Sequence, residues 1–472
     1  MSPFVLSFAV ACTGIVAAAW YLSLKPYRML LVFVLMSHFL VWFLKVTCSF
    51  LPTQYVALLP SGVVGLLYLA VGLQVVNRTK SPPRICCLDF LVGGLILTYI
   101  IQMFNDYVTV TFGLRAFHRT AFFAGTYFVG RHLLISSRYA HTLVRLIAIT
   151  VALGAIIGIL ETVFDIPLQG GYRDLVLEDS GINALRLSER RSVGTLTSCA
   201  AFGVMSCIGV LCAFVWLVSS RNRGWFLSSS SLMASAFGVV ISGSRSSIIA
   251  VFLGLLTGIG LLAGAGCLAS GLLTQLRKKA LHITLALTIT LSVMIMGVIL
   301  IETPLTDNVL RRVSTISPEA FLSGEVLHDR NLVARKIVWG AVWSNITQRP
   351  FLGYGTGILG GGSHREGVRF VRGHATVDNQ YLQLWGELGI LGLLLYCGII
   401  SAALVHGRSA RHNPEARILG VLVVAVAAMF AVAGLGSPPL DMYPANAFFW
   451  LILGMSPNLK RYRRLSTEAA NS

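Results

Sequence analysis

The feature that most constrains this chain is the recurrence of apolar stretches of about 20 residues along its whole length. Because an α-helix rises about 1.5 Å per residue, such a stretch can cross the roughly 30 Å of hydrocarbon in a bilayer. Only 12% of the 472 residues are charged, whereas a soluble domain has about 25%. We therefore predict an all-α, polytopic membrane helix bundle, with residues 1–472 forming a single integral membrane domain.

Thirteen apolar segments qualify as candidate transmembrane helices, which predicts a bundle of about 12–13 helices. The fifth and the thirteenth are the weakest, because they are short and interrupted by Gly or Pro. The segments are residues 4–24, 29–46, 55–76, 86–103, 119–135, 142–162, 196–219, 225–242, 246–266, 280–301, 381–405, 417–435 and 444–458.

The Lys and Arg residues alternate along the chain in a pattern that predicts topology. Every odd-numbered segment is followed by a basic loop, whereas even-numbered segments are followed by loops poor in Lys and Arg or by two long loops. Because basic loops remain cytoplasmic, the C-terminus is predicted to be cytoplasmic, and the long loops at 163–195 and 302–380 extracytoplasmic. The net charge of +18 is explained by this pattern. No nucleic-acid partner is expected, since no nucleic-acid motif accompanies the charge.

Cysteines and acidic motifs give no indication of a metal or a cofactor. Most of the nine cysteines lie inside apolar segments, without disulfide or metal-ligand spacing. No Asp-x-Asp motif is evident in the predicted outer loops. We expect neither a metal nor a cofactor.

The second long loop contains a segment with helical periodicity. Residues 330–348 place apolar side chains at roughly helical spacing, which predicts an amphipathic helix. A Gly-rich stretch at 353–362 follows it. This stretch is not a P-loop, because it lacks Gly-Lys-Ser/Thr and follows a helix; it is either a flexible cover over a site or simply a loop.

Three arginines near predicted outer helix ends are candidate anion ligands. Arg245 lies in the short SGSRSS turn between two apolar segments. It is either an interfacial anchor or a phosphate or diphosphate ligand, with donors added by Ser242, Ser244 and the free N–H groups of a helix N-terminus. Arg190 and Arg191 precede the seventh segment, where the same two alternatives apply.

A second group of polar residues precedes and enters the eleventh segment. His374 is bracketed by Arg372 and Asp378, and its imidazole can take a proton from an attacking hydroxyl. Asp378 and Asn379 are candidates to cap the following helix. Glu387 lies about two turns inside the apolar segment.

Four motifs in order make the chain resemble the O-antigen ligase and polysaccharide polymerase superfamily, whose members act on undecaprenyl-diphosphate-linked glycans in bacterial membranes. They are the GSRSS turn at 243–247, RKIVWGAVW beginning at Arg335, PFLGYGTG at 350–357, and His374 followed by NQYL at 379–382 and ELGILG at 387–392. The resemblance covers about residues 195–395. Four residues separate the His from the Asn, whereas many family members have them adjacent.

The resemblance implies a metal-independent membrane glycosyltransferase that acts on the extracytoplasmic face. His374, Arg245 and Arg191 would be the catalytic residues, with the arginines on the diphosphate and His374 on the acceptor hydroxyl. Further residues that the resemblance and the pattern assign to substrate binding are Arg190, Arg335, Arg372, Asp378, Asn379, Tyr381 and Glu387.

The acceptor distinguishes the possible activities. A polymerase would extend another lipid-linked repeat unit, as in exopolysaccharide, capsule or O-antigen synthesis, and the separated His and Asn favour this reading. A ligase would transfer the glycan to lipid A-core or to a protein. A lipid-linked glycan flippase and a structural membrane subunit are the alternatives from other classes. The resemblance places the chain in the bacterial inner membrane, with chain-length regulator and flippase proteins as candidate partners.

Overall fold

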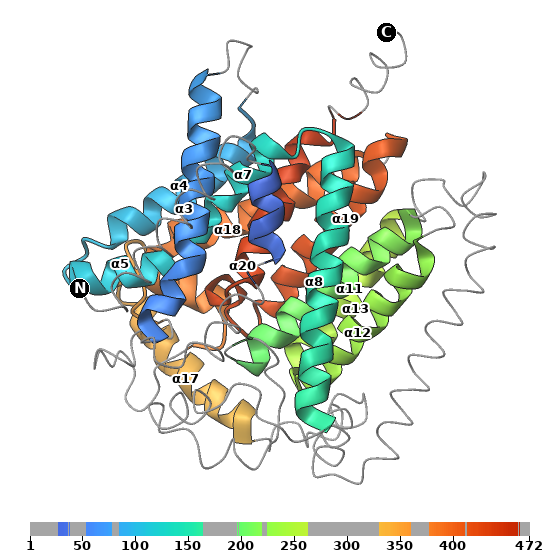
Figure 1. The fold of residues 1–472 in the computed structure, drawn as a ribbon. Helices are drawn as coiled ribbons and strands as arrows, with labels where there is room; N and C mark the ends of the chain where they lie inside the picture. Colours follow the sequence, from blue (N-terminus) through green and yellow to red (C-terminus); the bar gives the residue numbers. More distant parts are fainter. Residues whose placement is uncertain are drawn as a thin grey trace, which may run out of the picture.

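Every regular element that the structure describes is a helix (Figure 1). The structure is a computed structural model, and it describes residues 27–35, 37, 53–77, 85–163, 196, 198–219, 224–262, 330–359, 377–410, 413–460 and 462. The predicted all-α class is confirmed.

Five of the described helices are long and apolar enough to cross a membrane. They are α8 (Ser137–Val163), α11 (Cys199–Ser219), α13 (Arg245–Leu262), α18 (Gln380–Ser409) and α19 (Pro414–Ala433). Shorter apolar helices are formed within α3 (Thr53–Asn77), by α4 (Cys87–Gln102) and by α12 (Trp225–Ile241). The chain is thus a polytopic helical membrane protein. The predicted segments 4–24 and 280–301 lie outside the described residues, so the count of 12–13 spans stays a prediction.

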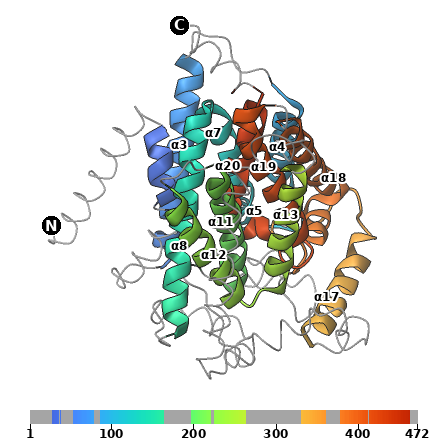
Figure 2. The same cartoon turned by 90° about the vertical axis from the view of Figure 1, so that its right-hand side faces the viewer.

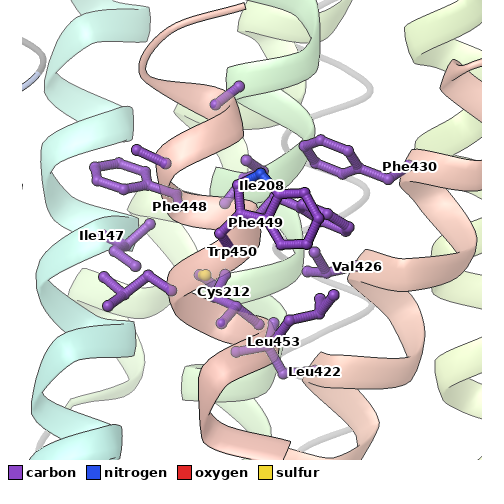
Figure 3. Packing of buried hydrophobic residues seen from close by; sticks show 14 of the residues in the cluster. Ile147, Ile208, Cys212, Leu422, Val426, Phe430, Phe448, Phe449, Trp450 and Leu453 are labelled. Atoms are coloured by element: carbon purple, nitrogen blue, oxygen red, sulfur yellow. The ribbon is translucent and has the colours of Figure 1, made fainter. Parts of the chain in front are cut away.

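The core of the bundle surrounds α20 (Ala445–Met455), all of whose residues are buried. In Figure 3 its aromatic side chains lie among residues of α8, α11 and α19. The rings of Phe430 and Phe449 stack with their centroids 4.0 Å apart. An eleven-residue helix is only about 16 Å long, so the predicted segment 444–458 is not a full transmembrane span by itself.

The predicted segment 119–135 is also not one helix. The structure divides it into α6 (Ala121–Ala124) and α7 (Thr126–Leu133), and Gly125 separates them. A side chain at Gly125 would meet the Tyr68 ring at 2.7 Å, and the Tyr68 hydroxyl donates a hydrogen bond to the carbonyl of Phe122. Helix α3 therefore packs closely against the chain at the point where α6 and α7 are separated. The preceding α5 (Val110–Arg119) was not predicted.

The helix α18 has a break at Gly389, where φ is 73° and ψ is −174°. The sequence predicted an uninterrupted helix over 381–405. The break divides α18 into a first half before Gly389 and a second half after it. Backbone groups that a break releases inside a membrane protein need other partners, and a preceding loop provides them here.

The helix predicted over 330–348 is confirmed as α17 (Arg330–Ile346), although Ile337, which belongs to the predicted apolar face, is exposed. It lies at one end of the bundle, and the C-terminal end of α8 points to the same end (Figures 1 and 2). Its side chains Val338, Val342 and Ile346 are buried against the loop that follows it and the start of α18. The candidate site lies at this end of the bundle.

Candidate functional site at the α17 end of the bundle

The turn between α12 and α13 is held by serine hydroxyls. Ser242 donates to the carbonyl of Val239 at 2.6 Å and accepts from the backbone N–H of Ser244 at 3.2 Å. The Ser247 hydroxyl donates to the Ser244 hydroxyl at 2.9 Å. Gly243 provides the positive φ of 60° that the turn requires. Arg245 is thereby fixed as the first residue of α13, where it is half-buried.

A second arginine reaches the same place from α17. The Arg335 guanidinium donates through Nη2 to the carbonyl of Gly436 at 3.1 Å and lies 3.3 Å from Oδ2 of Asp378. A Cβ added at Gly436 would be 2.8 Å from the Cβ of Ser246 and 3.8 Å from Nη1 of Arg335. Gly436 is therefore a junction where α17 and the first turn of α13 meet, and Arg335 lies close to the turn that carries Arg245.

The start of α18 completes the junction. Of the two predicted candidate caps, Asp378 and Asn379, the N-cap is Asn379, whose Oδ1 accepts from the N–H groups of Tyr381 and Leu382, both at 3.0 Å. The N–H of Gln380 donates to the carbonyl of Gly434 at 2.7 Å. Because these first N–H groups have partners, the N-terminus of α18 does not offer them to an anion. Asp378 precedes the cap, and its side chain is 44% exposed, so a polar ligand can reach it.

The three motif segments thus converge although they are far apart in the chain. Arg335 and Asp378 are joined directly, and both lie next to the α12–α13 turn through Gly436. The Arg335 side chain is 34% exposed. The Arg335 guanidinium, the hydroxyls of Ser244 and Ser246 on the neighbouring turn that carries Arg245, and solvent access form a combination suited to a phosphate or diphosphate.

The Gly-rich loop is packed into the protein. The N–H groups of Tyr354 and Gly355 donate to the carbonyls of Gly386 and Glu387, at 2.8 and 3.0 Å, and the N–H of Ile390 donates to Pro350 at 2.9 Å. These bonds satisfy the groups released at the break in α18. Glycines 353, 355 and 357 have positive φ values. Because glycine adopts positive φ without strain, these residues allow the turns by which the loop packs onto α18.

Tyr381 and Glu387 both lie in the first half of α18. The Tyr381 hydroxyl donates to the carbonyl of Ala431 at 2.7 Å. Glu387 is completely buried, and its Oε1 accepts from the N–H of Leu359 at 3.1 Å and from the amide of Gln383 at 3.2 Å. Glu387 therefore contacts the loop and its own helix.

The remaining candidate residues, Arg190, Arg191, Arg372 and His374, lie outside the described residues, so the structure does not place them relative to the junction. His374 precedes Asp378 by only four positions in the chain.

The sequence analysis missed Gly436 and Asp441. Both lie in GLGSPPLD at 434–441, between two apolar segments. The Gly and Pro residues there are a signal for a sharp turn, which was available in the sequence. Within the described ranges, no group of three or more His, Cys, Asp or Glu side chains is placed to hold a metal ion.

Residues 230–397 match the profile of the family described as O-antigen ligase. The predicted resemblance is confirmed over this part of the chain, which contains Arg245, Arg335, Asp378 and the start of α18. The similarity supports an activity of glycan ligation or polymerisation, of the membrane glycosyltransferase kind. No curated protein matches the chain.

Proposed function

We propose that this protein transfers or polymerises a glycan that is carried on undecaprenyl diphosphate, at the extracytoplasmic face of the bacterial inner membrane. The observation that carries the proposal is the junction at Gly436, which joins Arg335 to Asp378 and to the turn that begins with Arg245. The family match over 230–397 includes Arg245, Arg335 and Asp378 and ends before Gly436.

In this proposal the arginines act on the diphosphate. Arg245 lies in a hydrogen-bonded turn, which fixes the backbone from which its side chain extends before the donor arrives. Fixed cationic donors stabilise negative charge as it develops on a leaving diphosphate without reorganisation. Arg335 would contact the same group, and Arg190 and Arg191 are further candidates for it.

The acceptor side is assigned to His374. Its neutral imidazole would take the proton of the attacking acceptor hydroxyl, while the bond from the sugar to the diphosphate breaks. Asp378, four positions later, is the nearest described carboxylate in the chain and is a candidate to orient the acceptor. Arg372 is a further candidate for the same region.

The experiment compares donor binding and turnover in purified variants reconstituted in vesicles. Arg245→Ala and Arg245→Lys should weaken binding of the lipid-diphosphate glycan, since lysine lacks the two-pronged donor. His374→Ala should lower turnover by about 10²–10⁴-fold and leave donor binding nearly intact. Arg138→Ala, at an exposed arginine at the start of α8, is the control. Loss of donor binding in His374→Ala equal to that in Arg245→Ala would show that the division of roles is wrong.

The same preparation distinguishes the two acceptors. We favour a polymerase, because of the separation between His374 and Asn379. Vesicles that contain lipid-linked repeat units alone should then yield longer glycans. A strict requirement for lipid A-core would identify a ligase.

A further inference from the structure

Two carboxyl groups inside the protein share one hydrogen-bond donor. Glu387 lies in the first half of α18, and Asp441 is the last residue of η4 (Pro439–Asp441). The amide nitrogen Nε2 of Gln383 donates to Glu387 Oε1 at 3.2 Å and to Asp441 Oδ2 at 2.8 Å. The two carboxyl groups therefore lie within about two hydrogen-bond lengths of each other.

The surroundings provide little compensation for two negative charges. Oε2 of Glu387 and Oδ1 of Asp441 are shielded from solvent and have no hydrogen-bond partner within the described part of the chain. The hydroxyl of Tyr99 is also buried and lies within electrostatic reach of both carboxyls. The charged group that faces the pair from a packed element is Arg119 at the end of α5, and it acts on Asp441.

Physical chemistry disfavours the doubly ionised state of such a pair. Burial disfavours each charged form, and two carboxylates that share a site repel one another, so that one of them keeps its proton. Burial raises the pKa of the Asp441 carboxyl above its usual range. A proton on either group would also provide a donor for a carboxyl oxygen that lacks one.

We propose that Glu387 and Asp441 hold one proton between them near neutral pH, and that this proton keeps the Gly-rich loop seated on the first half of α18. Glu387 Oε1 accepts from the N–H of Leu359, and repulsion between two ionised carboxylates would push Glu387 away from Asp441 and disturb this contact. Asp441 connects the same half-helix to the turn before α20. Glu387 and Asp441 are thus positioning residues for the loop.

A dependence of stability on pH follows from the proposal. An acid whose pKa is higher in the folded than in the unfolded state binds more protons when folded. Its contribution is present at low pH and is lost as the pH rises through the folded-state pKa. The seating of the loop is therefore alkali-labile.

Infrared difference spectroscopy on the full chain in lipid nanodiscs tests the proton directly. The wild type should show the C=O stretch of a protonated carboxyl at about pH 7, and this band should disappear at alkaline pH. The double variant Glu387→Gln with Asp441→Asn should lack the band, whereas Asp106→Asn, at an exposed carboxyl, should retain it. A band that persists in the double variant, or no such band in the wild type, would overturn the proposal.

Thermal unfolding provides a second readout. The melting temperature of the wild type should fall by a few degrees, roughly, between about pH 6 and about pH 9, and Glu387→Gln alone should remove most of this fall. An unchanged pH profile in Glu387→Gln would contradict the positioning role. Loss of the infrared band on adding sodium at fixed pH would show that the pair is a cation site instead. None of these readouts uses transferase activity, so a failure of the shared-proton proposal can be distinguished from a failure of the proposed function.

Discussion

The guanidinium of Arg335 lies 3.3 Å from the carboxylate of Asp378, and the side chains are 34% and 44% exposed. Exposed ion pairs contribute about 0–1 kcal/mol to stability. The ion pair therefore adds little to stability, and the proposed role of Arg335 in binding the donor can be tested by substitution.

Arg335→Lys should lower activity by about 10–100-fold, because a hydrogen bond to a charged group contributes about 1.5–3 kcal/mol and lysine cannot reproduce the geometry of the guanidinium. The melting temperature should change little. Turnover and thermal unfolding of the purified variant are the measurements. Lys336→Ala, at the adjacent exposed cation, is the control, and equal losses in both variants would mean that only the general positive charge matters.

Gly389→Ala should destabilise the protein by at least about 2 kcal/mol. Its φ of 73° with ψ of −174° is essentially restricted to glycine, and an added Cβ would be 2.0 Å from the carbonyl oxygen of Phe351. Gly340→Ala in α17 is the matched control, because nothing lies within 4 Å of its added Cβ and alanine favours a helix. Chemical denaturation in detergent compares the two, and equal stability would show that the break tolerates a side chain.

Arg131→Ala should cost about 3–5 kcal/mol of stability, the range for removing one partner of a buried ion pair. Arg131 is 4% exposed, lies 3.4 Å from Asp89 Oδ1, and donates to Asn458 Oδ1 at 2.6 Å. The exposed Arg138→Ala should have little effect. Adding Asp89→Asn to Arg131→Ala should recover part of the loss, since it removes the carboxylate left unpaired. A purely additive double variant would contradict the pairing.

The predicted topology is tested by single cysteines in a cysteine-free background. Leu175→Cys and Gly360→Cys should react with an impermeant thiol reagent in intact cells, because both positions fall in the predicted outer loops. Ser409→Cys should not react; it is chosen because Ser409 is exposed at the end of α18, whereas Ala410 is buried. Labelling at 409 in intact cells would reverse the orientation.

The sequence predicted the elements whose signal is local. Residues 330–348 gave α17 because their apolar side chains recur at helical spacing, although Ile337 among them is exposed. Asn379 was one of two candidate caps, with Asp378, recognised from their position before an apolar segment. The break at Gly389 could not be read in the same way. It depends on the N–H groups of Tyr354 and Gly355 and on the carbonyl of Pro350, in a loop more than 30 positions earlier, and hydropathy does not report such pairing.

The junction at Gly436 could likewise be predicted only in part from the sequence. Motifs identified Arg245, Arg335 and Asp378, but not the contact that unites them. The backbone of Gly436 accepts from Arg335 and approaches Ser246 because the residue lacks a side chain, a property of three packed segments. Asp441 could not be predicted for the same reason, because it is linked to Glu387 by the amide of Gln383, which donates to both carboxyl groups.

The central position of α20 has a consequence for biogenesis. Its neighbours α6, α7, α11 and α19 all precede it in the chain, and each packs against it. These helices are therefore synthesised, and enter the membrane, before α20 has been made. Until residue 455 has emerged, these helices lack the fully buried segment against which they pack. Chains that are interrupted shortly before that point should be recognised by membrane quality control, although their transmembrane helices have already been inserted.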